Sequence, residues 1–112
     1  MKRENYKPRL IDRKVSEYLS AFGAVCIEGP KWCGKTTTAE QLAASILYMD
    51  DPEKKAQNIT MSELNPKRLL KGATPRLIDE WQLAPKLWDA IRFEVDHRGE
   101  LGQFILTGVY YG

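Results

Sequence analysis

One segment, residues 29–36, constrains the fold of this chain more than any other. It reads Gly-Pro-Lys-Trp-Cys-Gly-Lys-Thr and matches the pattern G-x-x-x-x-G-K-[ST] at every fixed position. The apolar run at residues 24–28 predicts a buried strand before the segment, and the residues from Lys35 onward predict a helix after it. Because the pattern has a physical meaning only between a strand and a helix, we expect an α/β fold built around this loop.

The chemistry of this loop is phosphate binding. The spacing of its two glycines lets successive backbone N–H groups point inward at a phosphate, and the helix that begins at Lys35 adds the positive end of its dipole. Lys35 would bridge the β- and γ-phosphates, and the Thr36 hydroxyl would ligate Mg²⁺. The alternative is a glycine-rich turn that carries a lysine by chance. The residues expected to contact the nucleotide are Gly29, Pro30, Lys31, Trp32, Cys33, Gly34, Lys35, Thr36 and Thr37.

Hydrophobic patterning along the chain predicts alternating strands and helices. Ile11, Val15, Tyr18 and Leu19 fall on one face of the first predicted helix, which Gly23 ends. The alternation implies a parallel sheet in a three-layer α/β domain. The predicted strands cover residues 24–28, 45–49, 76–79 and 103–107, and the predicted helices cover residues 10–22, 53–60, 67–71 and 85–98, with a further helix from residue 35.

An acidic pair, Asp79 and Glu80, follows the third predicted strand. The carboxyl end of that strand lies at the same edge of the sheet as the phosphate loop. Asp79 can therefore orient Mg²⁺ through its water, and Glu80 can accept the proton of the water that attacks the γ-phosphorus. The metal would relieve the repulsion between the adjacent carboxylates. The alternative is an ordinary Asp-Glu strand end that enters a turn.

Thr107 closes the fourth predicted strand. Its hydroxyl would lie between Asp79 and the γ-phosphate and help to place the water, whereas the alternative is a plain threonine at a strand end. The remaining candidates are interpreted as exposed or packing side chains rather than as catalytic groups: His97, Arg92, Arg98, Trp81 and Trp88.

The composition places these motifs in one small cytoplasmic domain. The chain has 112 residues, and its 17 Lys+Arg against 15 Asp+Glu give a net charge of +2, which does not indicate a nucleic-acid-binding surface. Cys26 and Cys33 make neither a disulfide framework nor a zinc site. No apolar run approaches the ~20 residues of a membrane span, and the first ten residues lack the apolar stretch of a signal peptide.

Four segments in this order resemble a family of prokaryotic AAA-type ATPases that carry a C-terminal domain after the ATPase core: residues 6–12, 28–37, 77–82 and 102–108. The resemblance implies that residues 29–36 are the Walker A motif, that Asp79 and Glu80 form the Walker B motif, and that Thr107 is sensor 1. It also implies ATP rather than GTP, the strand order 5-1-4-3-2, and a position near the adenine for residues 6–11.

The chain departs from the pattern of that family after Gly108, where it reads Val-Tyr-Tyr-Gly and stops. Strand five, the arginine finger, the helical lid with sensor 2 and the C-terminal domain would be missing. The resemblance therefore implies that residues 1–112 are the N-terminal part of a P-loop AAA-type ATPase domain, with an incomplete sheet in the order 1-4-3-2. The first strand would be an exposed edge, which favours association with other chains or with a second copy.

We therefore expect an Mg²⁺–ATP-binding module whose turnover is weak, because an arginine finger contributes ~10³–10⁵ in rate. The catalytic set would be Glu80, Lys35 and Thr107, with Thr36 and Asp79 at the metal. One alternative is a non-catalytic truncated remnant that acts through association, by its sheet edge or by residues 110–111. Another is a P-loop small-molecule kinase, for which the sequence offers neither an acceptor site nor a lid arginine cluster.

Overall fold

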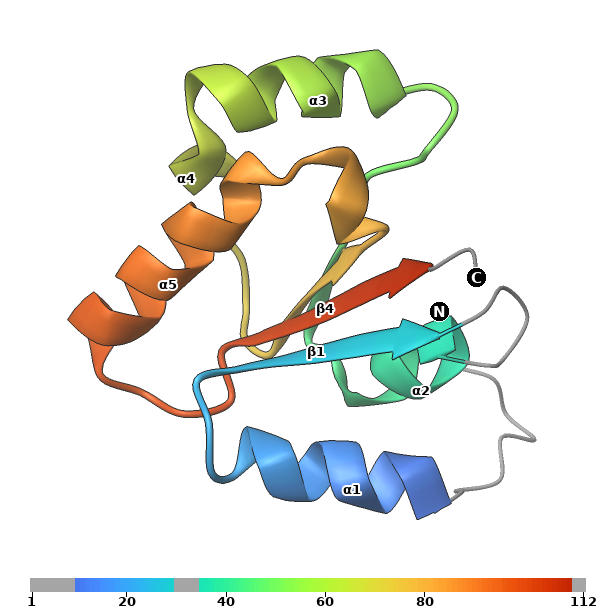
Figure 1. Cartoon of the computed structure of the whole chain (residues 1–112), viewed down its shortest axis with the longest axis vertical. Helices are drawn as coiled ribbons and strands as arrows, with labels where there is room; N and C mark the ends of the chain where they lie inside the picture. The colour runs from blue at the N-terminus through green and yellow to red at the C-terminus, as the bar shows by residue number, and fades with distance from the viewer. Residues whose placement is uncertain (1–9, 30–34, 110–112) are drawn as a thin grey trace.

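The computed structural model describes residues 10–29 and 35–109, and within them strands and helices alternate (Figure 1). The strands are β1 (Ala24–Gly29), β2 (Ser45–Tyr48), β3 (Arg76–Asp79) and β4 (Phe104–Val109). The helices are α1 (Leu10–Leu19), α2 (Lys35–Leu42), α3 (Lys55–Leu64), α4 (Pro66–Leu69) and α5 (Lys86–Arg98), and a short 3₁₀ helix, η1 (Trp81–Leu83), follows β3.

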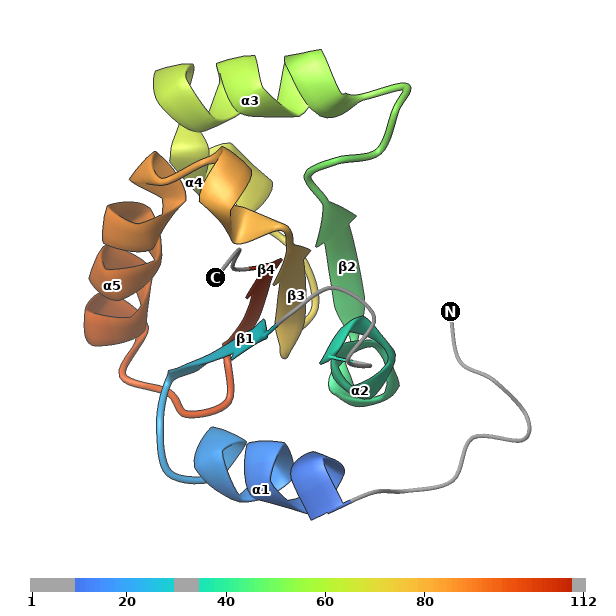
Figure 2. The ribbon, with the colours of Figure 1, turned by 45° about the vertical axis from the view of Figure 1, so that its right-hand side comes forward.

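The four strands form one parallel sheet in the order β1-β4-β3-β2 (Figure 2). This confirms the predicted order 1-4-3-2. The first residues of the strands are register partners across the whole sheet: Ala24, Phe104, Arg76 and Ser45. The strands therefore start level, and their carboxyl ends meet at one edge.

Helices cover both faces of the sheet, with α1 and α2 on one side and α3, α4 and α5 on the other (Figure 1). Alternate strand residues supply the two cores, as the two-residue period of a strand requires. Leu77 and Ile105 pack in the cluster of α1 and α2, with Val15, Leu19 and Ala39. Ile78, Phe104 and Leu106 pack in the cluster of the opposite face, with Leu70, Leu87 and Ile91. This is the predicted three-layer α/β architecture.

Helices α1, α3 and α4 differ from their predicted bounds: α3 ends at Leu64 rather than at residue 60, and α4 ends at Leu69 rather than at residue 71. Helix α1 ends at Leu19 rather than at Phe22, because the chain leaves it in a tighter turn in which the Ala21 N–H donates to the Tyr18 carbonyl, three residues back. Tyr18 is 50% exposed and its ring lies against that of Phe22, so it does not join Val15 and Leu19 in the core. Helix α3 begins at Lys55 rather than at Glu53, because the Asp51 carboxylate accepts the Glu53 N–H and holds a turn before the helix.

Helix α5 matches its predicted bounds closely and ends before Gly99. This glycine adopts a left-handed conformation (φ 65°), and its N–H donates to the Val95 carbonyl, as in a helix C-cap. None of the helices in the two described ranges is long and apolar enough to cross a membrane.

Candidate functional site

A row of three polar residues crosses the carboxyl edge of the sheet. Tyr48, Asp79 and Thr107 end or nearly end β2, β3 and β4, and they are register partners of one another. They alternate with residues of the α3–α5 face, so they belong to the face that α2 covers. The strand register therefore brings these three polar residues side by side, although Tyr48 and Asp79 are 31 positions apart in the sequence and Asp79 and Thr107 are 28 positions apart.

Asp79 and Thr107 form the centre of this row. The Thr107 hydroxyl donates a hydrogen bond of 2.5 Å to Oδ1 of Asp79. Asp79 is 7% exposed and Thr107 is completely buried. A buried carboxylate requires hydrogen-bond donors, and a bond to a charged acceptor is stronger than one between neutral groups. The structure thus places the Thr107 hydroxyl next to Asp79, the carboxylate beside which the sequence predicted it.

Glu80 lies directly after this row and has a different partner. Its backbone adopts the left-handed conformation (φ 60°, ψ 47°), which no other non-glycine residue in the described ranges adopts. This turn takes the chain out of the sheet into η1. Oε2 of Glu80 accepts a hydrogen bond of 2.7 Å from Nε2 of Gln82. A left-handed residue other than glycine costs ~1–2 kcal/mol, and such strain is concentrated at functional sites.

Helix α2 begins on the side of the sheet where this row lies. It starts six residues after the end of β1 and finishes three residues before β2 begins, so it runs back along the sheet from the carboxyl edge toward the amino edge. The Tyr48 hydroxyl donates a hydrogen bond to Oε2 of Glu40, in the last turn of α2. Lys35 precedes Glu40 by about one and a half turns, so the first turn of α2 lies further toward the carboxyl edge.

The same contact changes the acidity of Tyr48. Burial raises the pKa of its hydroxyl above the ordinary value of 10.0, and the hydrogen bond to Glu40 and the charges of Glu40 and Asp79 raise it further. The two carboxylates that shift this pKa lie on α2 and β3. The Tyr48 hydroxyl is thus a neutral donor in an acidic environment.

Part of the predicted site lies outside the described residues. This holds for residues 30–34 of the phosphate loop and for the side chains of Lys35 and Thr36, as well as for residues 6–9 and 110–111. The residues of the predicted set that the structure does describe are Gly29, which ends β1, and Thr37, Asp79, Glu80 and Thr107.

The described residues provide oxygen donors for a hard cation at this edge but no complete metal site. No group of three or more His, Cys, Asp or Glu side chains in residues 10–29 and 35–109 could hold a metal ion. Mg²⁺ is usually held by one or two protein oxygens together with water and phosphate, so the carboxylate of Asp79 fits this pattern.

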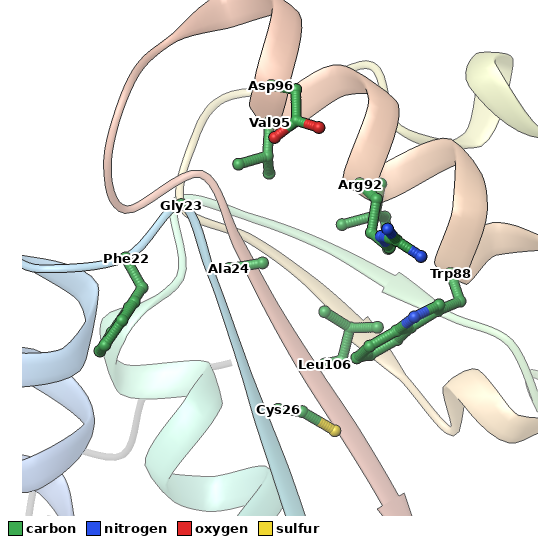
Figure 3. Close-up of a pocket in the computed structure, with 10 residues that line it drawn as sticks. Phe22, Gly23, Ala24, Cys26, Trp88, Arg92, Val95, Asp96 and Leu106 are labelled. Atoms are coloured by element: carbon green, nitrogen blue, oxygen red, sulfur yellow. The ribbon is translucent and has the colours of Figure 1, made fainter.

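A separate hollow of about 420 Å³ lies between β1 and α5, away from the polar row (Figure 3). Its lining includes Phe22, Cys26 and Trp88, and none of Asp79, Glu80 or Thr107. It is mostly apolar and contains no convergent set of polar groups. The chemistry therefore lies at the strand ends rather than in this hollow.

The remaining sequence candidates have structural contacts. His97 stacks on Phe93 with ring centroids 3.7 Å apart, and the rings of Trp81 and Trp88 pack at 5.4 Å. Arg98 is not a purely solvated charge, because its guanidinium donates to Oε2 of Glu94 at 3.0 Å and to Oε1 of Gln103 at 3.1 Å. Arg98 is exposed to solvent, as the sequence interpretation expects, and it also supplies a cation to the buried Glu94 carboxylate.

Two residues of this region carry no signal in a short motif: Tyr48 and Glu40. Tyr48 belongs to an apolar strand pattern, and Glu40 reads as a surface residue of a helix. Their pairing depends on how α2 lies against β2. Gln82 ends the segment 77–82 that carries the family resemblance, but its contact with Glu80 was not predicted, because that contact depends on the turn at Glu80.

Comparison with known proteins agrees with this geometry. The chain has no match among curated proteins or solved structures. A protein-family model described as "AAA domain" matches residues 21–110, which include all four described strands. The matched region carries the phosphate-loop sequence, the acidic pair and Thr107. The chain therefore belongs to the family of AAA domains, which are nucleotide-binding modules.

Proposed function

We propose that this chain binds Mg²⁺–ATP at the carboxyl edge of its sheet and hydrolyses it slowly to ADP and phosphate. The observation that supports this proposal most strongly is the buried hydrogen bond between Thr107 and Asp79. It places a carboxylate and a hydroxyl together where parallel α/β sheets bind their ligands, at the strand ends nearest the start of α2.

The proposal assigns the phosphates to residues 29–37. Backbone N–H groups and the amino end of α2 would hold the phosphate oxygens, and Lys35 would contact the β- and γ-phosphates. Thr36 and Asp79 would hold the cation, directly and through water respectively. Mg²⁺, when bound, neutralises charge on the phosphate oxygens.

Glu80 is the proposed general base. As the water oxygen bonds to the γ-phosphorus, the bond from that phosphorus to the β,γ-bridging oxygen breaks, and the water proton passes to Glu80. Thr107 would hold Asp79 and help to orient the water. Slow turnover follows if no arginine finger reaches the γ-phosphate, because such a residue contributes ~10³–10⁵ in rate.

The test is ligand-dependent stabilisation of the purified chain, with Lys35→Ala as the site variant and Lys86→Ala as the control. A ligand at 100 times its Kd stabilises the native state by ~2.7 kcal/mol, so Mg²⁺–ATP should raise the melting temperature of the wild type and of K86A but not of K35A. No shift in the wild type, or an equal shift in K35A, would refute the proposed binding. Single-turnover hydrolysis, lost in Glu80→Gln, tests the base.

A second candidate function, association of two copies through β1, is favoured by a different observation. Among the described strands β1 pairs only with β4, so its outer edge is open, and the hollow beside it is lined by Phe22, Cys26 and Trp88. Open strand edges and apolar hollows favour association. Sedimentation of the wild type and of Cys26→Lys tests this: a dimer lost in C26K supports it, and a monomeric wild type refutes it.

A further inference from the structure

We infer that Gln82 is a positioning residue for Glu80, holding the proposed base in one orientation through its side-chain amide. The inference rests on the proposed function, because it concerns how the assigned base is held. Gln82 lies in η1, two residues after Glu80, and belongs to neither the phosphate loop nor the acidic pair.

The first supporting observation is the hydrogen bond itself. Nε2 of Gln82 donates to Oε2 of Glu80 at 2.7 Å, a short bond for an amide donor, as expected with a charged acceptor. The bond occupies one oxygen of the carboxylate and leaves the other oxygen to accept a proton. A base that is held in this way loses less freedom when it engages a water, so it reacts from a prepared geometry.

The second observation is that the other end of the amide is enclosed. Oε1 of Gln82 is buried and accepts no hydrogen bond from any residue in the described ranges. A Cβ at Gly108 would lie 2.8 Å from this oxygen and 3.0 Å from Nε1 of Trp81. Gln82 therefore fits against β4 only because position 108 has no side chain.

The third observation concerns the orientation of the amide. If the amide were turned over, its oxygen would face the Glu80 carboxylate and two acceptors would oppose each other. Only the observed orientation gives the carboxylate a donor. Burying an acceptor without a partner is unfavourable, and the bond to the charged Glu80 carboxylate offsets part of this cost.

Gly108 also connects Gln82 to the polar row. It follows Thr107 directly in β4, while Glu80 follows Asp79 directly in β3. The strand end that carries the hydroxyl donor to Asp79 thus also provides the space for the amide donor to Glu80. Each carboxylate of the acidic pair is held by its own donor.

The experiment compares single-turnover hydrolysis of Mg²⁺–ATP, with protein in excess, among the wild type, Gln82→Ala and Gln82→Glu. Q82E keeps the shape of the side chain but replaces the donor by an acceptor. We expect Q82A to hydrolyse about tenfold more slowly and Q82E at least as slowly, with the Kd for Mg²⁺–ADP unchanged within twofold. Gly108→Ala, which displaces the amide oxygen, should also slow the reaction. Gln57→Ala, at an exposed glutamine of α3, serves as the control.

Two results would overturn the inference. A wild-type rate in Q82E would show that Gln82 acts only by packing, and a faster rate in Q82A would show that it restrains Glu80 instead. Q82A combined with Glu80→Gln should be no slower than E80Q alone, because the two residues act as a unit.

A second measurement separates this inference from the proposed function. The side-chain ¹⁵N–¹H₂ signals of Gln82 should have a proton shifted downfield by the charged acceptor, and Glu80→Ala should remove that shift. If the shift is absent, Gln82 does not hold Glu80 and the inference fails, whatever the rates are. If the shift is present but E80Q hydrolyses as fast as the wild type, the contact stands and Glu80 is not the base, so the proposed function fails instead.

Discussion

The Thr107 hydroxyl donates a hydrogen bond of 2.5 Å to Oδ1 of Asp79 on the adjacent strand, although the two residues are 28 positions apart in the sequence. Both side chains are withdrawn from solvent. The register of β3 and β4 makes them direct partners, so the pairing of these strands brings the two side chains together. Any movement of the end of β4 would therefore be transmitted to the Asp79 carboxylate.

This bond should contribute measurably to stability. Thr107→Val keeps the volume but removes the donor, so we expect the free energy of unfolding to fall by about 2–3 kcal/mol, the cost of leaving a buried charged acceptor without that partner. Thr107→Ser keeps the donor and loses one methyl group, so it should cost only about 1 kcal/mol. Urea unfolding of the three proteins provides the measurement. Equal stability of T107V and the wild type would show that the hydrogen bond from Thr107 to Asp79 does not stabilise the fold.

The polar row also shows what a sequence can and cannot predict. The β3 bounds and the placement of Asp79 at its carboxyl end follow from an apolar run ended by a carboxylate, a pattern with few alternatives. The pairing of Asp79 with Thr107 needs the strand order, which the resemblance to AAA-type ATPases supplied. These parts of the site depend on local pattern and topology, and both can be read from the chain.

Other contacts depend on packing that no local pattern encodes. The bond between Tyr48 and Glu40 arises because α2 lies across the end of β2. The bond between Gln82 and Glu80 requires a left-handed backbone at a glutamate, which residue preference argues against. Tyr18 has the correct helical spacing for burial, yet among the side chains of α1 that the structure describes, Val15 and Leu19 are the ones in the core.

Tyr48 should make the stability depend on alkaline pH. Its pKa is raised in the folded state above the ordinary value of 10.0, first by burial and then by Glu40 and Asp79. The folded state thus keeps the proton that the unfolded state loses. The stability that Tyr48 contributes is fully present below pH 10 and is lost as the pH rises toward the folded pKa.

Tyr48→Phe provides the measurement of this effect. We expect Y48F to be less stable than the wild type by about 1 kcal/mol at pH 8, because the hydrogen bond to Glu40 is lost. Between pH 10 and pH 11 the difference in urea midpoint should shrink. Tyr18→Phe, at a half-exposed tyrosine, is the matched control. A difference that stays constant or grows above pH 10 would show that Glu40 does not hold the protonated hydroxyl.

Cys26 should react slowly despite its exposure. The pKa of its thiol is raised from 9.0 to about 11, chiefly by burial. The charge of Glu28 and the hydrogen bond to Oε1 of Glu28 also raise this pKa, whereas Trp81 has a smaller opposing effect. Two units of pKa correspond to ~100-fold less thiolate at pH 8, and the thiolate is the reactive form.

The rate of alkylation by iodoacetamide tests this in the Cys33→Ser background, where Cys26 is the single thiol. The rate should rise with pH to a midpoint near 11. Glu28→Gln should raise the rate at pH 8 severalfold, because it removes the negative charge, whereas Glu17→Gln, an exposed carboxylate of α1, should not change it. A midpoint below pH 9 would contradict the effect of burial.

Among the glycines whose surroundings the structure describes, Gly23 should tolerate a side chain least. A Cβ at this position would lie 2.2 Å from Cγ1 of Val95, where α5 passes over the start of β1. The Gly23 carbonyl also accepts the N–H groups of Gln103 and Phe104, so the backbone cannot easily move away. Overpacking of this kind costs about 1–3 kcal/mol or more, so Gly23→Ala should lower the urea midpoint strongly.

Two comparisons separate the steric cause from other effects. Gly99→Ala meets nothing within 4 Å and carries only the strain of its left-handed backbone, about 1 kcal/mol. Val95→Ala should recover part of the loss, so the double variant G23A/V95A should be more stable than the sum of the two single changes predicts. If the effects simply add, the cost of G23A does not come from Val95, and α5 does not pack over the start of β1 as closely as its position indicates.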